Sequence, residues 1–292
     1  MIILLKPIST DNNKNDNIMS EDKKMTTIDN QVEEPAQPAQ GGKLSLINFP
    51  NALTCMNLIS GCIATCFAFF HSPDLALMWI IIGAVFDFFD GMSARALHIA
   101  SPIGKELDSL ADDVTFGVAP STIIFSQLII MDFPPSWGMV SSYIPFVAYL
   151  MAAFSALRLA KFNLDTRQSM GFIGLPTPAN ALFWGSLILT ASEWFNSLSW
   201  GAFLIIVLML VSCWLLISEV PMFALKFKHW GLKGNELRYG FLAVSALVII
   251  GKTIVGYTHG SIAMGFLGSW WIVIVLYILV SVIADLSKRG EA

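Results

Sequence analysis

Apolar segments long enough to cross a lipid bilayer recur along the chain from Phe49 onward. A helix needs about 20 predominantly apolar residues to span the hydrocarbon core, because each residue advances it by about 1.5 Å. The pattern predicts about eight membrane-spanning helices, over residues 52–70, 75–97, 107–131, 142–163, 178–195, 200–218, 239–257 and 266–286. We therefore expect an all-α integral membrane protein.

Basic residues divide unequally between the two sides of this predicted arrangement. The connections on one side, together with the C-terminus, carry eleven of the 17 Lys and Arg residues, namely Arg95, Lys105, Arg158, Lys161, Arg167, Lys226, Lys228, Lys233, Arg238, Lys288 and Arg289. The opposite connections carry only Lys252. Because basic loops stay in the cytoplasm, the pattern predicts a multi-pass protein of the cytoplasmic membrane with both termini cytoplasmic. Lys226, Lys228 and Lys233 are expected at anionic head groups.

The composition separates a polar N-terminal segment from the rest of the chain. Residues 1–42 are rich in polar and charged side chains, and we expect them to form a disordered tail. The whole chain is 55% hydrophobic and only 13% charged, whereas soluble domains are about a quarter charged. Its 21 Phe and nine Trp suit contact with membrane lipids. No basic stripe is present, which argues against a nucleic-acid partner.

Acidic residues gather at one place among the apolar segments. Asp87 and Asp90 lie near the end of the second predicted helix, and Asp108 and Asp112 lie near the start of the third. At about 100° per residue, each pair shares one face of its helix. The short connection makes the two helices antiparallel neighbours, so we expect all four carboxylates to meet at the cytoplasmic end. Acids at membrane depth are costly and favour a functional role.

Four ionised carboxylates repel one another strongly at low dielectric, and either protons or divalent cations must offset this repulsion. An all-oxygen ligand set favours Mg²⁺, Mn²⁺ or Ca²⁺ over zinc. We expect two ions of Mg²⁺ or Mn²⁺, because paired metals that share carboxylates are the usual arrangement for displacement at phosphorus. On the same face Gly91 and Ala94 leave room for a ligand, and Arg95 beside them can pair with a phosphate.

The acids belong to a longer spaced pattern, Asp87-x2-Asp90-Gly91-x2-Ala94-Arg95-x8-Gly104-x3-Asp108-x3-Asp112. At all eight positions it resembles the signature of the CDP-alcohol phosphatidyltransferase superfamily. The resemblance implies a six-helix membrane core, usually homodimeric, with a divalent-metal site that faces the cytoplasm. It also implies transfer of a phosphatidyl group from a CDP-linked lipid to an alcohol, with release of CMP. On this basis residues 43–230 form the core and residues 231–292 add two C-terminal helices.

The segments around the motif narrow the resemblance. Residues 50–61, 156–163 and 174–181, with weaker support from 217–223, resemble the CDP-diacylglycerol–serine O-phosphatidyltransferases, or phosphatidylserine synthases, within the superfamily. Asn57 stands where glycerophosphate-using relatives tend to have Arg. The resemblance therefore implies CDP-diacylglycerol and L-serine as substrates.

The same resemblance, together with the helix geometry, suggests a role for each site residue. Asp87, Asp90, Asp108 and Asp112 are expected to hold metal, and Asp112 is also the candidate base. Contact with CDP-diacylglycerol is expected from Gly91, Ala94, Arg95 and Asn57. Arg158 and Lys161 are the candidates for the serine carboxylate or a lipid phosphate. Asp113 lies about 100° from Asp112 around an α-helix and is expected at most to orient a basic side chain.

Other functions are weaker fits. A relative that uses glycerol phosphate or inositol phosphate would need several cations around a phosphate dianion. Two cations and the neutral Asn57 suit one carboxylate better. A cation-coupled transporter would place its ions near the midplane between two repeated halves, whereas these acids cluster at one helix end. A membrane prenyltransferase would need a second Asp-rich motif, and only the isolated Asp165 and Asp285 follow in the later part of the chain.

Overall fold

The structure, a computed structural model, describes residues 48–99, 101–165, 167, 172–223, 231 and 234–290, without the side chains of 135, 136 and 288–290. The predicted N-terminal tail therefore lies outside the described residues, as do Lys226, Lys228 and Lys233.

Helices occupy each of the predicted membrane-spanning ranges. The described elements are α1 (Phe49–Phe69), α2 (Pro73–Ala96), α3 (Pro102–Asp112), η2 (Asp113–Val118), α4 (Ala119–Ile129), η3 (Pro135–Ser142), η4 (Ile144–Tyr149), α5 (Leu150–Leu164), β1 (Phe172–Ile173), α6 (Thr177–Ser197), α7 (Gly201–Ile217), β2 (Pro221–Met222), α8 (Glu236–Thr258), α9 (Ile262–Leu267) and α10 (Trp270–Gly290). Within the described part of the chain, five helical stretches are long and apolar enough to cross a membrane: Phe49–Phe69, Pro73–Ala96, Trp137–Leu164, Glu236–Thr258 and Ile262–Ser287. The prediction of an all-α, multi-pass membrane protein is confirmed.

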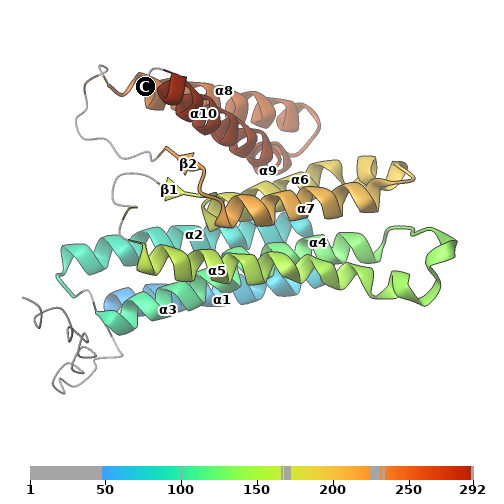
Figure 1. Cartoon of the computed structure of the whole chain (residues 1–292), viewed down its shortest axis with the longest axis horizontal. Coiled ribbons are helices and arrows are strands. Elements are labelled where there is room, and N and C mark those ends of the chain that lie inside the picture. The colour runs from blue at the N-terminus through green and yellow to red at the C-terminus, as the bar shows by residue number, and fades with distance from the viewer. Residues whose placement is uncertain are drawn as a thin grey trace, which may run out of the picture. The chain divides into compact units, whose positions relative to one another are not determined.

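Helices α1 to α7 run alongside one another as a bundle (Figure 1). Helix α1 packs against α2, α3 and α4, while α6 packs between α2, α4 and α7. The bundle core is apolar and includes the fully buried side chains of Phe116, Trp184 and Met209. The indole N–H of Trp184 is satisfied by a 3.0 Å hydrogen bond to Ser212 Oγ. This bond ties α6 to α7 where no water is available to the indole.

Helices α1 and α3, which both line the acid cluster, begin with the same kind of capped first turn. Asn48 caps α1 by accepting a hydrogen bond from the backbone N–H of Asn51 at 2.8 Å, and Pro50 follows in the first turn. Ser101 caps α3 by accepting one from the N–H of Gly104 at 3.1 Å, and Pro102 follows. A capping side chain satisfies one of the free N–H groups of a first turn, and proline there has no N–H to lose. The caps fix where both helices begin.

The third predicted span is not one continuous α-helix. Helix α3 ends at Asp112, the π-helical segment η2 occupies Asp113–Val118, and α4 then continues the same span. A π-helical turn contains an extra residue and rotates the side chains that follow it relative to an α-helix. Asp112 and Asp113 both keep α-helical φ and ψ, so this rotation affects the residues after the segment and not the position of Asp113 relative to Asp112. The fourth span differs in a similar way, because the 3₁₀ segments η3 and η4 precede α5.

Close packing joins the π-helical segment to the first two helices. A Cβ atom placed on Gly61 of α1 would lie 2.7 Å from Thr115 Cα, and one on Gly83 of α2 would lie 2.6 Å from Thr115 Cγ2. Thr115 also donates a 3.0 Å hydrogen bond from its hydroxyl to the carbonyl oxygen of Asn57. The contact depends on both glycines, because any larger side chain would push η2 away from α1 and α2.

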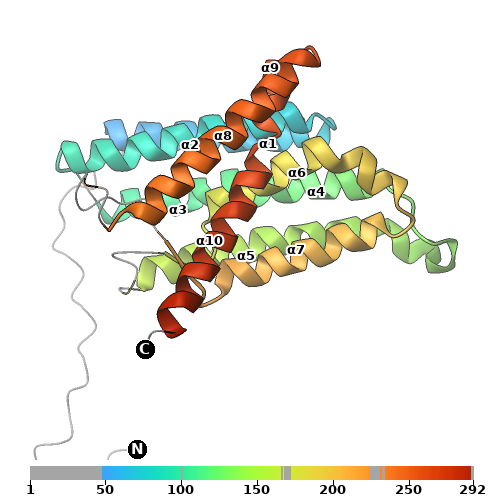
Figure 2. The ribbon, with the colours of Figure 1, turned by 90° about the horizontal axis from the view of Figure 1, so that it is seen from above.

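The last helices cross the bundle obliquely (Figure 2). Helix α10 packs on α6, where the backbone N–H of Trp271 donates to Ser186 Oγ at 3.1 Å. The hydroxyl of Tyr277, also on α10, donates to the carbonyl oxygen of Phe223 at 3.0 Å. Phe223 follows β2, which pairs antiparallel with β1. The strand β1 after α5 and the strand β2 after α7 are therefore held by their pairing and by the hydrogen bond from α10.

The glycine contact gives a stability prediction. Gly61→Ala should lower the melting temperature of the detergent-solubilised protein by several degrees, because overpacking at a backbone contact costs about 1–3 kcal/mol. Gly251→Ala is the matched control, since a Cβ there would have no neighbour within 4 Å. Thermal unfolding followed by tryptophan fluorescence measures both variants. Equal melting temperatures for the two would contradict the proposed tight contact.

Candidate functional site

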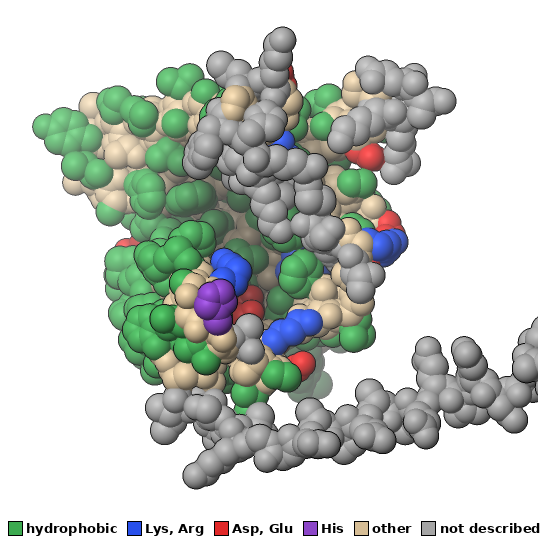
Figure 3. All heavy atoms as spheres, turned by 90° about the vertical axis from the view of Figure 1, so that its left-hand side faces the viewer, with side chains coloured by type: hydrophobic (Ala, Val, Ile, Leu, Met, Phe, Trp, Pro, Cys, Tyr) green, Lys and Arg blue, Asp and Glu red, His purple; other side chains and the backbone are tan. Residues whose placement is uncertain are grey.

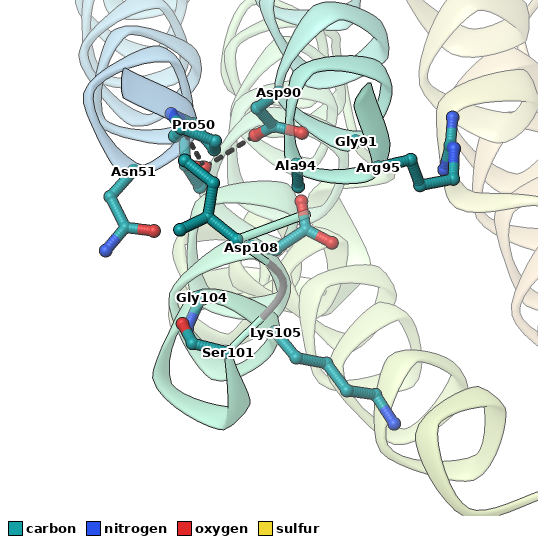
Figure 4. Close-up of a pocket in the computed structure, with 12 residues that line it drawn as sticks. Pro50, Asn51, Asp90, Gly91, Ala94, Arg95, Ser101, Gly104, Lys105 and Asp108 are labelled. Carbon is teal, nitrogen blue, oxygen red and sulfur yellow. Dashed lines mark hydrogen bonds between the residues drawn. The ribbon is translucent and has the colours of Figure 1, made fainter. Parts of the chain in front are cut away.

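Three of the predicted acidic residues converge at one end of the bundle. Asp87 and Asp90 come from α2, and Asp108 comes from α3. One carboxylate oxygen from each residue lies within 4.8 Å of the other two. Figure 4 shows Asp90 and Asp108 facing the same space from their two helices. The antiparallel arrangement of α2 and α3, expected from their short connection, brings these acids together.

The donor atoms of this triad fit a divalent cation. Asp90 is 5% exposed and accepts a 2.6 Å hydrogen bond from the hydroxyl of Thr54. In the part of the chain that the structure describes, the buried Oδ1 atom of Asp108 has no hydrogen-bond partner. Buried carboxylate oxygens that repel one another and lack donors require a positive charge. An all-oxygen set of this kind suits Mg²⁺ or Mn²⁺.

The fourth acid, Asp112, lies beside the triad and is held from α1. The amide Nδ2 of Asn57 donates to Asp112 Oδ1 at 3.0 Å, and the carboxyl groups of Asp112 and Asp87 also interact. Asn57 is fully buried. The sequence analysis assigned Asn57 to the nucleotide lipid, and that assignment stays a prediction. In the structure, Asn57 positions the Asp112 carboxylate through this hydrogen bond.

A cavity of about 230 Å³ opens beside the triad. It is lined from three helices by Pro50, Asn51, Thr54, Asp90, Gly91, Ala94, Arg95, Ile99, Ser101, Gly104, Lys105 and Asp108. Gly91 and Ala94 thus line the space next to the carboxylates, as the sequence predicts. Figure 3 shows this end of the molecule, where Lys, Arg, Asp and Glu side chains gather around a hollow bordered by hydrophobic surface.

Two cations stand at the edge of this cavity. Figure 4 shows the side chains of Arg95 and Lys105 extending away from Asp90 and Asp108, and both residues are exposed. Lys105 Nζ donates to the carbonyl oxygen of Asn163 at 2.9 Å, which connects α3 to α5. Arg95 lies one turn after Gly91 and is available at the rim for an anionic ligand.

The two predicted serine-binding cations have different surroundings. Arg158 is buried, and its guanidinium lies 5.1 Å from the centre of the Phe162 ring. Its Nη1 donates a long 3.4 Å hydrogen bond to Thr177 Oγ1, and its charge interacts with Asp112. Arg158 is therefore close enough to the acid cluster to serve the same site.

Lys161 is engaged by an acidic residue from another part of the chain. Its ammonium donates to the carboxylate of Glu219 and to the carbonyl oxygen of Ile217, the latter at 3.2 Å. Arg167 joins Glu219 at 3.2 Å and Asp165 at 2.7 Å. The hydrogen bond from Lys161 and the nearby cations lower the pKa of Glu219 below its usual value. The role of Lys161 in serine binding stays a prediction.

The sequence analysis gave no role to Thr54, although this residue donates directly to Asp90. The sequence of α1 contains a pattern that could have indicated this role of Thr54. Asn51, Thr54, Asn57 and Ser60 recur every three residues in an otherwise apolar helix. Each step of three residues turns the helix by about 300°, so consecutive members lie about 60° apart and the series winds gradually around α1; all four are buried. A polar stripe that faces the acids could have been predicted from this periodicity.

Comparison with known proteins agrees with the geometry of the acid cluster. Residues 47–225 match the family model for CDP-alcohol phosphatidyltransferase, and this range includes every acid of the cluster. The chain is 40% identical over 134 residues to a protein of Bacillus subtilis named CDP-diacylglycerol–serine O-phosphatidyltransferase, a match that covers 44% of this chain and 68% of that protein.

Two further relatives carry the same name. The Mycobacterium leprae protein is 33% identical over 147 residues, covering 50% of this chain and 48% of that protein. The Helicobacter pylori protein is 35% identical over 136 residues, covering 46% of this chain and 54% of that protein. The chain thus spans about half to two thirds of the length of these relatives. Because the family model covers more than half of the sequence and its acidic residues meet in one site, the chain belongs to the CDP-alcohol phosphatidyltransferase family.

Proposed function

We propose that this chain transfers the phosphatidyl group of CDP-diacylglycerol to the hydroxyl of L-serine, giving phosphatidylserine and CMP. The observation that carries the proposal is the convergence of Asp87, Asp90 and Asp108, with Asp112 beside them, in a family that performs this type of transfer. The serine hydroxyl oxygen forms a bond to the phosphorus of the phosphatidyl group. The bond from that phosphorus to the CMP oxygen breaks, and the hydroxyl proton passes to a carboxylate.

We propose that Asp87, Asp90 and Asp108 hold Mg²⁺ or Mn²⁺, with Asp112 completing the ligand set for a second ion. Ions held by these carboxylates would supply positive charge to the diphosphate of the donor. Two observations support the fit, namely the separation of at most 4.8 Å between the triad oxygens and the unpartnered Asp108 Oδ1. Thr54 offsets part of the charge on Asp90 through its 2.6 Å hydrogen bond.

The cavity beside the triad is the proposed place of the nucleotide part of the donor. Gly91 and Ala94 present little side chain toward it, which lets a ligand approach the carboxylates closely. Arg95 at the rim pairs with a phosphate group. Asn57 acts indirectly, because its hydrogen bond fixes Asp112 in the orientation needed to accept a proton.

We propose that Arg158 binds the serine carboxylate, with Lys161 as the second predicted cation. Arg158 is buried and interacts with Asp112, so an acceptor bound to its guanidinium would lie near the proton-accepting carboxylate. Glycerol phosphate or inositol phosphate remains the alternative acceptor class. Glu219 offsets the charge of Lys161, so the net positive charge that Arg158 and Lys161 offer together suits a carboxylate better than a phosphate dianion.

The proposed setting is the cytoplasmic membrane, with the site and both termini on the cytoplasmic side. Its support is the concentration of Lys and Arg in the connections that adjoin the acid cluster. We also propose a homodimer, which is usual for the superfamily that the motif resembles.

Metal removal tests the proposed role of the triad. Dialysis against EDTA should abolish formation of phosphatidylserine from CDP-diacylglycerol and labelled serine, and added Mg²⁺ or Mn²⁺ should restore it, because the uncompensated carboxylates cannot hold the diphosphate. Radiolabelled product on a thin-layer plate gives the readout. Full activity in rigorously metal-free buffer would contradict the metal assignment.

A parallel acceptor assay tests the substrate. The full-length protein should form a labelled lipid from serine, and none from glycerol 3-phosphate or inositol phosphate, when each is supplied with the same CDP-diacylglycerol. Product from a phosphorylated acceptor without product from serine would refute the proposed acceptor while leaving family membership intact.

Asp112→Asn should lower kcat by at least about 10²-fold, the lower end of general-base contributions. Asp74→Asn is the matched control, because Asp74 lies in the first turn of α2 and not in its last turns, where the acid cluster lies. Steady-state kinetics with saturating serine and donor measure the effect. A kcat for Asp112→Asn within about threefold of Asp74→Asn would remove Asp112 from the proton transfer.

A further inference from the structure

Four buried polar side-chain atoms of η2, α5 and α6 lack hydrogen-bond partners in the described part of the chain. They are Asp113 Oδ1, Ser155 Oγ, and both Nδ2 and Oδ1 of Asn180. Ser155 and Asn180 are fully buried. Buried polar side-chain atoms in native proteins nearly always have a partner, so a group of such atoms indicates an absent polar ligand or ordered water.

These atoms come from three segments that pack together. The π-helical segment η2 contacts both α5 and α6. A Cβ placed on Gly117 of η2 would lie 2.6 Å from Asp113 Oδ1 and 3.0 Å from Ser155 Cβ. Asp113 and Ser155 therefore approach the same point, from η2 and from α5, and Gly117 leaves that point free of a side chain.

Arg158 connects the region around Asp113 and Ser155 to helix α6. It lies three residues after Ser155, on the same side of α5, and both residues are buried. Its Nη1 donates to Thr177 Oγ1 at the start of α6, and Asn180 lies three residues further along that helix. The charge of Arg158 also interacts with Asp112, the neighbour of Asp113 in the chain. We call Asp113, Ser155, Arg158, Thr177 and Asn180 the acceptor cluster.

We propose that the acceptor cluster binds the zwitterionic part of an α-amino acid, with Arg158 on its carboxylate and Asp113 on its ammonium group. The proposal rests on the proposed function and specifies how that site selects its acceptor. An ammonium group donates three hydrogen bonds, and Asp113 Oδ1, Ser155 Oγ and Asn180 Oδ1 are the unpartnered acceptors that meet it. A carboxylate accepts from the guanidinium of Arg158 and from Asn180 Nδ2.

The cluster also explains discrimination against phosphorylated acceptors. The Asp113 carboxylate would repel a phosphate dianion at this place, whereas it attracts an ammonium group. Asp113 is thus a specificity-determining residue, distinct from the metal-holding acids and from the proposed base Asp112. The sequence analysis set Asp113 aside because an α-helix would turn it by about 100° from Asp112. Asp112 and Asp113 keep α-helical φ and ψ, so this rotation holds, and Asp113 Oδ1 lies beside Gly117, close to Ser155 of α5.

The test measures binding of the acceptor separately from chemistry. With the full-length protein in mixed micelles that contain CDP-diacylglycerol, Asp113→Asn should raise the KM for serine by at least about 10-fold and leave the KM for CDP-diacylglycerol within about twofold. Asp74→Asn, the same chemical change in the first turn of α2, should alter neither constant.

Unreactive analogues identify which group Asp113 contacts. Alanine retains the ammonium and carboxylate of serine without the hydroxyl, and propionate lacks the ammonium as well. Alanine should inhibit the wild-type protein competitively with an inhibition constant at least about 10-fold lower than that of propionate, and Asp113→Asn should reduce this preference to about twofold or less. A merely structural role for Asp113 would weaken both inhibitors equally.

Asn180→Ala provides a second route if Asp113→Asn does not fold. It should raise the KM for serine and weaken inhibition by alanine while donor affinity is retained. If the wild-type protein makes phosphatidylserine but the variants that fold keep its serine KM and its preference for alanine, the buried atoms bind water only and the inference is wrong. If the wild-type protein makes no phosphatidylserine at all, the proposed function fails instead.

Discussion

Electrostatic repulsion among the clustered carboxylates is the constraint on which the rest of this structure depends. Three acids bring oxygens within 4.8 Å of one another in a protein that is otherwise strongly apolar. Such charges are tolerated only where donors or cations compensate them. Thr54 donates to Asp90 and Asn57 donates to Asp112, both from the polar stripe of α1. Oxygen atoms that remain without donors are positions at which a divalent cation could bind.

Helix packing keeps this arrangement in place. Gly61 and Gly83 allow Thr115 to contact both α1 and α2. The Thr115 hydroxyl also donates a hydrogen bond to the backbone carbonyl oxygen of Asn57. The contact lies on the segment that directly follows Asp112. Protein interiors have low compressibility, so a larger side chain at either glycine would displace the neighbouring helices and, with them, the acids. The catalytic geometry and the stability of the bundle therefore depend on the same close contacts.

Local features of the site could be predicted from the sequence, and its long-range contacts could not. The positions of Asp87, Asp90 and Asp108 follow from helical periodicity and one short connection, both of which are local properties of the chain. The approach of Asp113 to Gly117 and Ser155 did not follow, because it depends on how η2 packs against α5. The pairing of Lys161 with Glu219 joins residues 58 positions apart and depends on how the segment after α7 folds back. The polar positions Thr54 and Asn57 of α1 can be recognised in the sequence, but their hydrogen-bond partners Asp90 and Asp112 cannot.

The central claim is that the triad holds divalent metal where the donor's diphosphate binds. Anomalous diffraction from crystals of the full-length protein grown with Mn²⁺ and CDP-diacylglycerol tests it most directly. We expect manganese density between Asp87, Asp90 and Asp108, in contact with the diphosphate, and loss of that density in Asp108→Asn. Ordered donor in the cavity without manganese at the triad, or manganese bound at a different set of residues, would contradict the account.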